Sequence, residues 1–175
     1  MAGDVQLVTE TIRPVELEHD GDALLGLLDA YAADPMGGGK PLPEPVKAAL
    51  VPGLKARSDY FGFIAFREGR PAGLVNCFEG FSTFLARPLM NIHDVVVLPE
   101  FRGQGLSLRL LDRVETLALA RGCCKLTLEV LSGNAVAKAA YERFGFAGYA
   151  LDPAAGEAVF WEKSLGPLGV RAGTV

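Results

Sequence analysis

The stretch PEFRGQGLS, residues 99–107, joins an apolar run to a segment with helical periodicity. The first N–H groups of a helix lack partners within the helix, and the helix dipole adds partial positive charge there. Gly103 and Gly105 have no Cβ, so a ligand could approach these amides closely. Arg102 adds a full positive charge, and Ser107 adds a hydroxyl. This combination suits a phosphate or pyrophosphate. The alternative is a plain strand-to-helix turn that needs glycine only for its dihedral angles.

Two common phosphate-binding patterns do not match this stretch. A P-loop requires a Gly-Lys-Ser/Thr sequence after the turn, and this chain has none there. The third glycine of the dinucleotide-binding fingerprint is missing, and the helix follows strands that we expect to form a meander. The ligand class therefore has to be read from the flanking residues.

Asn134 and Tyr141 form a second group that could take part in chemistry. They stand seven residues apart in a segment expected to be helical. At 3.6 residues per turn they point within roughly 20° of each other, so both could contact one ligand. The alternative is that Asn134 caps the helix and Tyr141 packs on a sheet.

The elements that must position these residues follow from the apolar pattern. Alternating or continuous apolar runs predict strands at residues 5–12, 60–67, 72–78, 91–98, 125–131, 146–151 and 158–163. Apolar residues at helical spacing predict helices capped by Asp20 or Asp22 and reaching Tyr31, then at 46–57 with a break near Pro52, at 105–121 and at 134–144. The Gly/Pro-rich segment 34–45 is expected to be a mobile loop between two helices. This order predicts an α/β or α+β domain with one central sheet.

Composition narrows the function classes. The chain has 175 residues, half of them hydrophobic, which is enough apolar material for one domain with a sizeable core. Its net charge of −4 argues against nucleic acid or an anionic membrane as the main partner. We see neither a signal peptide nor an apolar run of about 20 residues. We therefore expect no membrane span, and we expect a cytoplasmic location. Three cysteines and two histidines indicate neither a disulfide framework nor a metal site.

Read with its flanks, VVVLPEFRGQGLSLRLLDRV, residues 95–114, resembles the pyrophosphate-binding motif of the GNAT superfamily of acyl-CoA-dependent N-acyltransferases. The family pattern Gln/Arg-x-x-Gly-x-Gly/Ala reads here as Arg102-x-x-Gly105-x-Ser107, so the last position departs. LEVLSGNAVAKAAYERFGF, residues 128–146, is similar to the family's later motif. The resemblance covers about residues 60–163. It implies one GNAT domain over residues 1–175, with a mixed sheet of about seven strands and about four helices.

The resemblance also implies a co-substrate, acetyl-CoA, and the residues that bind it. Its pyrophosphate would be bound at Arg102 and by the backbone amides of Gly103, Gln104, Gly105, Leu106, Ser107 and Leu108. Its pantetheine arm would bind like an added strand to the backbone of Val95, Val96 and Val97. Asn134 would contact the cofactor or a water. Tyr141 would be the general acid that protonates the leaving thiolate, since the ordinary pKa of tyrosine, about 10, suits a thiol.

A base is also needed, because an ammonium group must lose a proton before it attacks. Glu129 lies on the polar side of a predicted strand, and ribosomal-protein N-acetyltransferases of the family have their proposed base there. His93 and Asp94 precede the cofactor strand, where diamine acetyltransferases carry an acidic pair. Imidazole titrates near neutrality, so His93 could serve. Glu129 is the first choice, followed by His93 and then Asp94, and each has a structural hydrogen bond as its alternative role.

The function implied by the resemblance is an acetyl-CoA-dependent N-acetyltransferase that acts by direct attack of a primary amine. A small-molecule amine is the first choice of acceptor, and a protein N-terminus or lysine is the second. A non-catalytic acyl-CoA-binding sensor stays open, because a fold does not fix a function. No metal is expected, and a homodimer is plausible from family habit alone.

Overall fold

A computed structural model describes residues 9–149, 158–163 and 165 of the chain. Its centre is a five-stranded sheet in the order β1-β2-β3-β4-β5. All neighbours are antiparallel except β4 and β5, which are parallel. The strands are β1 (Glu10–Pro14), β2 (Tyr60–Arg67), β3 (Arg70–Ser82), β4 (Arg87–Val97) and β5 (Leu126–Leu128).

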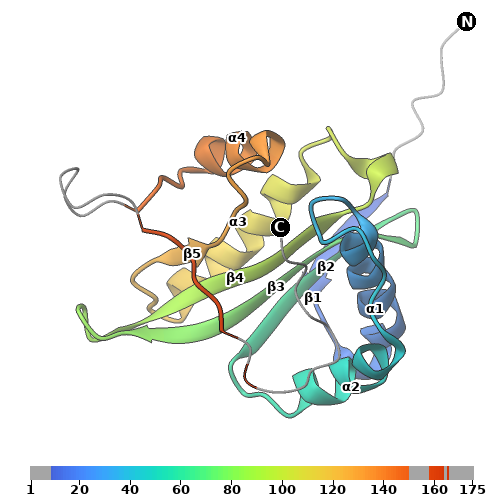
Figure 1. Cartoon of the computed structure of the whole chain (residues 1–175), viewed down its shortest axis with the longest axis horizontal. Helices are drawn as coiled ribbons and strands as arrows, with labels where there is room; N and C mark the ends of the chain where they lie inside the picture. The colour runs from blue at the N-terminus through green and yellow to red at the C-terminus, as the bar shows by residue number, and fades with distance from the viewer. Residues whose placement is uncertain (1–8, 150–157, 164, 166–175) are drawn as a thin grey trace, which may run out of the picture.

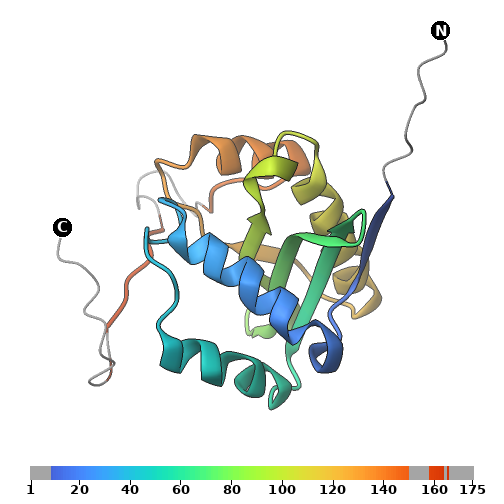
Figure 2. The same ribbon diagram turned by 90° about the vertical axis from the view of Figure 1, so that its right-hand side faces the viewer.

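Helices cover both faces of the sheet (Figures 1 and 2). On one face lie α1 (Leu17–Ala33) and α2 (Glu44–Lys55), and on the other lies α3 (Leu106–Ala120) with α4 (Ala135–Phe144) beside it. A short 3₁₀ turn, η1 (Pro99–Phe101), connects β4 to the loop that precedes α3.

Two apolar cores, one on each face, hold these layers together. Alternation along the strands turns Ile64, Leu74 and Val96 toward the leucines of α1. The opposite set, which includes Val75 and Ile92, packs against the apolar stripe of α3. The sheet is therefore buried on both faces, and the site must form at its ends or where neighbouring strands separate.

The mixed α and β fold is confirmed, and so is the predicted order of elements as far as α4. The two last predicted strands are wrong within the described residues, because 146–149 and 158–163 contain no strand. The prediction there rested on β propensity, which expresses how well a side chain fits a half-buried sheet. Phe160 and Trp161 are instead 77% and 85% exposed. The described sheet thus has five strands rather than about seven, and residues 150–157 lie outside the description.

The separation of β4 from β5 prepares the site. The two strands pair only from Met90 to Ile92, whereas β4 continues to pair with β3 as far as Val97. A bulge lies between these segments: Ile92 opposes Cys77 and Asp94 opposes the preceding Asn76, so His93 is an extra residue in β4. Beyond the bulge, the edge of β4 that faced β5 has no strand partner in the described part of the chain.

The start of α1 differs from the prediction. The helix begins at Leu17, so Asp20 lies in its first turn rather than at its cap. The side chain of the N-cap residue Glu16 makes no capping bond, and the Asp20 carboxylate accepts from the Glu16 N–H at 2.8 Å instead. Arg13 donates to both Asp20 oxygens at 2.7 Å. The Arg13 guanidinium and the Glu16 amide together hold the pKa of Asp20 below its ordinary value.

None of the described helices has the length and apolar character needed to cross a bilayer.

Asp20→Asn should lower the free energy of unfolding at pH 7 by about 1–3 kcal/mol, because a buried charge-assisted network loses its acceptor. The pKa of Asp20 is depressed in the folded state, so its contribution is present above the unfolded-state pKa. It is lost as the pH falls through the folded-state pKa. Urea denaturation between neutral pH and about pH 3 should therefore show a weaker acid dependence in the variant. The exposed Asp22, changed to Asn, is the matched control, and an equal loss in both variants would contradict the prediction.

Candidate active site

A cavity of about 500 Å³ opens where β4 leaves β5. Its wall is mostly apolar and comes from the end of α1, the end of β4, the glycine turn and α4. The lining residues are Tyr31, Asp34, Met36, Val95, Val96, Val97, Phe101, Arg102, Gly103, Gly105, Leu106, Ser107, Gly133, Asn134, Ala135, Val136, Ala137, Ala140 and Tyr141. The two sequence motifs, about 30 residues apart in the chain, thus face one another across a single cavity.

The glycine turn offers a run of free amides to this cavity. Gly103 and Gly105 both have φ of 73°, a left-handed conformation that glycine adopts without strain. Gly105 is the N-cap of α3. Within the described part of the chain, no hydrogen bond uses the N–H groups of residues 103–108. Six consecutive unpaired amides at a helix start make a site for an anion with several oxygens, such as a pyrophosphate.

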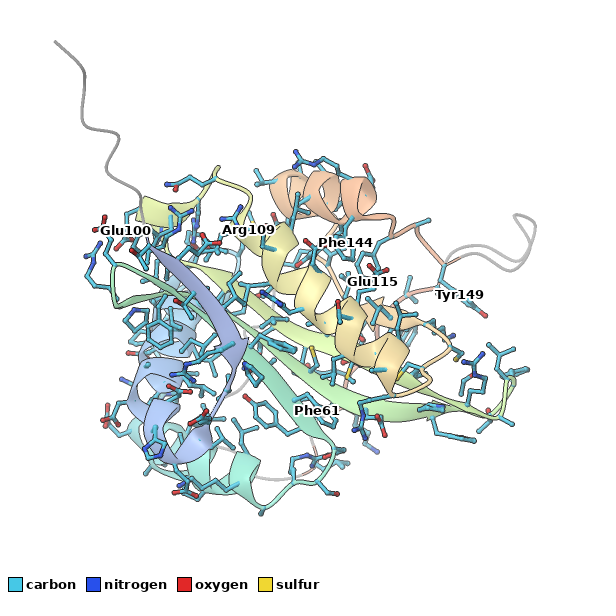
Figure 3. All side chains as sticks on the ribbon, turned by 180° about the vertical axis from the view of Figure 1, so that it is seen from behind. Phe61, Glu100, Arg109, Glu115, Phe144 and Tyr149 are labelled. Carbon is cyan, nitrogen blue, oxygen red and sulfur yellow. The ribbon has the colours of Figure 1, made fainter. Side chains whose placement is uncertain are left out.

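An ion-pair network connects this glycine turn to strands β1 and β2. Arg109, at the start of α3 (Figure 3), donates from Nη1 to the Gln104 carbonyl at 2.9 Å. The same guanidinium binds both carboxylate oxygens of Glu10 in β1, at 2.6 and 2.8 Å, and Arg67 binds Glu10 at 2.6 Å. These guanidinium groups, Arg109 first, hold the pKa of Glu10 below its ordinary value. The turn is therefore fixed to β1, at the edge of the sheet, by a side chain that binds a carbonyl of the turn and none of its amides.

Arg102 is bound within the protein rather than free at the rim of the cavity. Its Nη2 donates to Asp34 Oδ2 at 2.9 Å, and its Nε donates to the Val97 carbonyl at 2.9 Å. Asp34 also accepts from the Met36 N–H, and this bond and the Arg102 guanidinium keep the pKa of Asp34 below its ordinary value. Arg102 thus connects the end of β4 to the segment after α1. Sequence reasoning missed this pairing.

Asn134 and Tyr141 both line the cavity, as their seven-residue spacing predicted. Asn134 also caps α4, since its Oδ1 accepts from the Ala137 N–H at 3.1 Å. The Tyr141 ring meets Phe146 edge-on at 5.9 Å. Burial, with a smaller effect from Tyr31, raises the pKa of Tyr141 to about 12. The Tyr141 hydroxyl is therefore protonated near neutral pH.

Tyr31 is a cavity residue that the sequence indicated only as part of the apolar face of α1. Burial raises the pKa of its hydroxyl, and the Asp94 and Asp34 carboxylates raise it further. Its position follows from the docking of α1 on the sheet, which no local signal encodes. Gln104 and Leu108, which the sequence placed at the cofactor, do not line the cavity with their side chains.

None of the three candidate bases lines the cavity itself. Glu129 follows the end of β5, is exposed, and accepts from Asn91 at 3.4 Å. His93 is the exposed extra residue of the bulge, with Nδ1 3.7 Å from Asp94 Oδ1. Asp94 directly precedes Val95 of the cavity wall and is the least exposed of the three. No group of three or more metal-binding side chains occurs among the described residues.

The sequence matches the model of the family described as the acetyltransferase (GNAT) family over residues 25–146. It is 37% identical over 65 residues to the thialysine N-epsilon-acetyltransferase of Bos taurus. That alignment spans 37% of this chain and 38% of the bovine protein.

Solved structures share the fold. A probable acetyltransferase is similar with a TM-score of 0.75 at 22% identity, covering 89% of this chain and 99% of the other. The aminoglycoside N-acetyltransferase AAC(6')-Iy, solved in complex with CoA, has a TM-score of 0.71 at 17% identity. Here the match covers 90% of this chain and 97% of the other.

Gly105→Ala should weaken CoA binding by about tenfold or more, because a Cβ at φ of 73° costs roughly 1–2 kcal/mol and the turn would relax away from its amide-presenting shape. Isothermal titration with CoA measures this change. Gly26→Ala is the matched control, since a Cβ on Gly26 of α1 meets no atom within 4 Å. Unchanged affinity in Gly105→Ala would show that the turn does not bind the ligand through this shape.

Proposed function

Because the chain belongs to the acetyltransferase (GNAT) family, we propose that it transfers an acetyl group from acetyl-CoA to a primary amine of a small molecule. The observation that carries this proposal is one cavity whose wall combines the glycine turn, with amides that are unpaired in the described part of the chain, the end of β4 and the partly buried Tyr141. Two of the similar proteins are named for small amines, thialysine and an aminoglycoside, which supports an acceptor of that kind.

The residues of the cavity fit acetyl-CoA. The amides of residues 103–108 hold its pyrophosphate, and the ion pair of Arg109 with Glu10 keeps them in place. The free edge of β4 at Val95–Val97 bonds the amide-rich pantetheine arm in the manner of an added strand. A backbone N–H of that edge stabilises the oxyanion as the tetrahedral intermediate forms. Ser107 replaces the glycine or alanine of the family pattern and adds a hydroxyl to the phosphate end.

Tyr141 is the general acid in this mechanism. The amine nitrogen attacks the thioester carbonyl carbon, the C–S bond breaks, and the thiolate takes the proton from the Tyr141 hydroxyl. A pKa of about 12 makes the hydroxyl a weaker acid than an ordinary tyrosine. The thiolate forms in the same apolar cavity, and burial penalises its charge as well. Burial thus raises the pKa of the donor hydroxyl and also that of the thiol that forms, so the proton transfer keeps its driving force.

Asp94 is the group that we assign to the ammonium proton, ahead of Glu129 and His93. It stands beside Val95 of the cavity wall, and its charge acts on Tyr31 inside the cavity. A carboxylate in this place both attracts a cationic amine and accepts its proton. Glu129 is exposed just after β5 and accepts from Asn91. The His93 side chain is 63% exposed, and its ring packs edge-on against Phe78.

Two further expectations, a homodimer and a cytoplasmic location, are part of the proposal. The homodimer is expected from family habit, and light scattering on the purified protein tests it. The cytoplasmic location is expected from the sequence. A protein N-terminus or lysine is the alternative acceptor, and an acyl-CoA sensor is the alternative function.

Incubation with acetyl-CoA and panels of amines, amino acids and peptides, followed by mass spectrometry, tests the proposed function. We expect acetylation of at least one small amine, with one free thiol released for each acetyl group transferred. Acetylation of peptides alone would move the assignment to the second acceptor class. Tight binding of acetyl-CoA with no acceptor modified would support the sensor.

Tyr141→Phe should lower kcat by about 100-fold, because the leaving thiolate loses its proton donor, while the dissociation constant of CoA stays nearly unchanged. Thiol release followed with a chromogenic disulfide measures kcat. Tyr149→Phe, at an exposed tyrosine outside the cavity wall, is the control for the loss of a hydroxyl. Wild-type turnover in Tyr141→Phe would remove Tyr141 from the mechanism.

A further inference from the structure

A row of polar side chains crosses three adjacent strands next to the cavity. The Tyr60 hydroxyl of β2 donates to Asn76 Oδ1 of β3 at 3.0 Å. Asn76 Nδ2 donates in turn to Asp94 Oδ2 of β4, also at 3.0 Å. Asn76 is 2% exposed, and its sequence neighbours Val75 and Cys77 are buried in the core on the α3 side. A chain of hydrogen bonds thus runs from the interior of the sheet to the carboxylate beside the cavity.

The chemistry of these groups fixes the direction of the chain. An ionised carboxylate only accepts hydrogen bonds, so the Asn76 amide must present its nitrogen to Asp94. Its oxygen then faces Tyr60 and needs a donor, which the hydroxyl supplies. Burial raises the pKa of Tyr60, so that hydroxyl keeps its proton. The tyrosine therefore determines which way the amide points, and the amide determines which carboxylate oxygen is bound.

A glycine makes room for this arrangement. Gly62 opposes Asn76 in the β2–β3 register and stands two residues after Tyr60 on the same face of β2. A Cβ at Gly62 would lie 2.4 Å from the Tyr60 Oη and 3.0 Å from a Val15 methyl. The hydroxyl reaches Asn76 only because position 62 carries no side chain. A buried amide is costly unless both of its ends are bonded, and here three strands contribute to bonding it.

We propose that Tyr60 and Asn76 are positioning residues that hold the Asp94 carboxylate by Oδ2 and leave Oδ1 to meet the acceptor amine. In the described part of the chain no donor lies within hydrogen-bond distance of Oδ1, since His93 Nδ1 is 3.7 Å away. This inference rests on the proposed function, in which Asp94 takes the ammonium proton. A carboxylate free to rotate would place that oxygen correctly for only part of the time.

Steady-state kinetics of Tyr60→Phe and Asn76→Leu test the proposal. We expect kcat to fall about tenfold in the first variant and about 100-fold in the second, with KM for acetyl-CoA unchanged. Val75→Ala is the matched control, because Val75 neighbours Asn76 but packs in the core on the α3 side. It should lower Tm and leave kcat unchanged. Wild-type kcat in both network variants would overturn the proposal.

A second measurement separates positioning from a general structural role. In an Asp94→Asn background, Asn76→Leu should cost nothing further in kcat, because residues that act through one another are not additive. The same fold-loss in both backgrounds would show that Asn76 acts independently of Asp94 and would overturn the proposal.

Nuclear magnetic resonance keeps the inference testable apart from catalysis. One side-chain amide proton of Asn76 should resonate downfield and exchange slowly in the wild type. It should move upfield in Asp94→Asn and shift in Tyr60→Phe. Side-chain signals at the position of a free amide would overturn the positioning role, whatever the enzyme assay gives. An absence of acetyl transfer to any amine, with these signals as expected, would count against the proposed function alone.

Discussion

The parting of β4 from β5 after Ile92 is the constraint on which the rest of the site depends. A strand edge inside a protein carries backbone groups that need partners. Among the residues that the structure describes, β4 has a neighbouring strand on only one side from the bulge to Val97. Helix α3 cannot continue β4 directly, so the chain turns through Pro99–Phe101 and two left-handed glycines before the helix begins. The free strand edge and the free helix-start amides are therefore consecutive parts of one chain segment. Together they make a long polar surface on one side of an otherwise apolar cavity.

Charged pairs that join distant parts of the sequence hold this segment in shape. Arg109 and Glu10 are 99 residues apart, and Arg102 and Asp34 are 68 apart. Each arginine binds a backbone carbonyl of the segment as well as a carboxylate of another element. Their role is to fix the backbone while its N–H groups remain available. The free amides and the helix dipole add positive charge at the glycine turn, while the guanidinium groups of Arg102 and Arg109 are bound to carbonyls and carboxylates.

Local patterns predicted the parts of this protein that depend on local physics. Strand alternation and the helical stripe of α3 predicted the element order. The resemblance to the family motifs pointed to Arg102, Gly105, Asn134 and Tyr141, which all line the cavity. The helix start at Leu17 was missed because Asp20 binds back to Glu16 rather than capping the helix. The two final strands were predicted from propensity alone, which does not say whether a partner strand is in place. The positions of Tyr31 and of the polar row from Tyr60 to Asp94 depend on how helices and strands pack together. The row comes from three separate segments of the sequence, and no local pattern indicates that they meet.

The bulge in β4 restricts the sequence changes that this chain can accept during evolution. Ile92 packs in the core under α3, as do Val95 and Val97 after the bulge, while Val96 faces α1. In a regular strand, residues 92 and 95 would face opposite sides of the sheet. Only the extra residue of the bulge lets both pack on the α3 side. Loss or gain of one residue near position 93 would turn Asp94 and the valines to the wrong faces together, whereas exchange of the exposed His93 side chain would not. The number of residues in this part of β4 is therefore constrained more strictly than the residue type at position 93. Related chains should differ here by substitution and not by insertion or deletion.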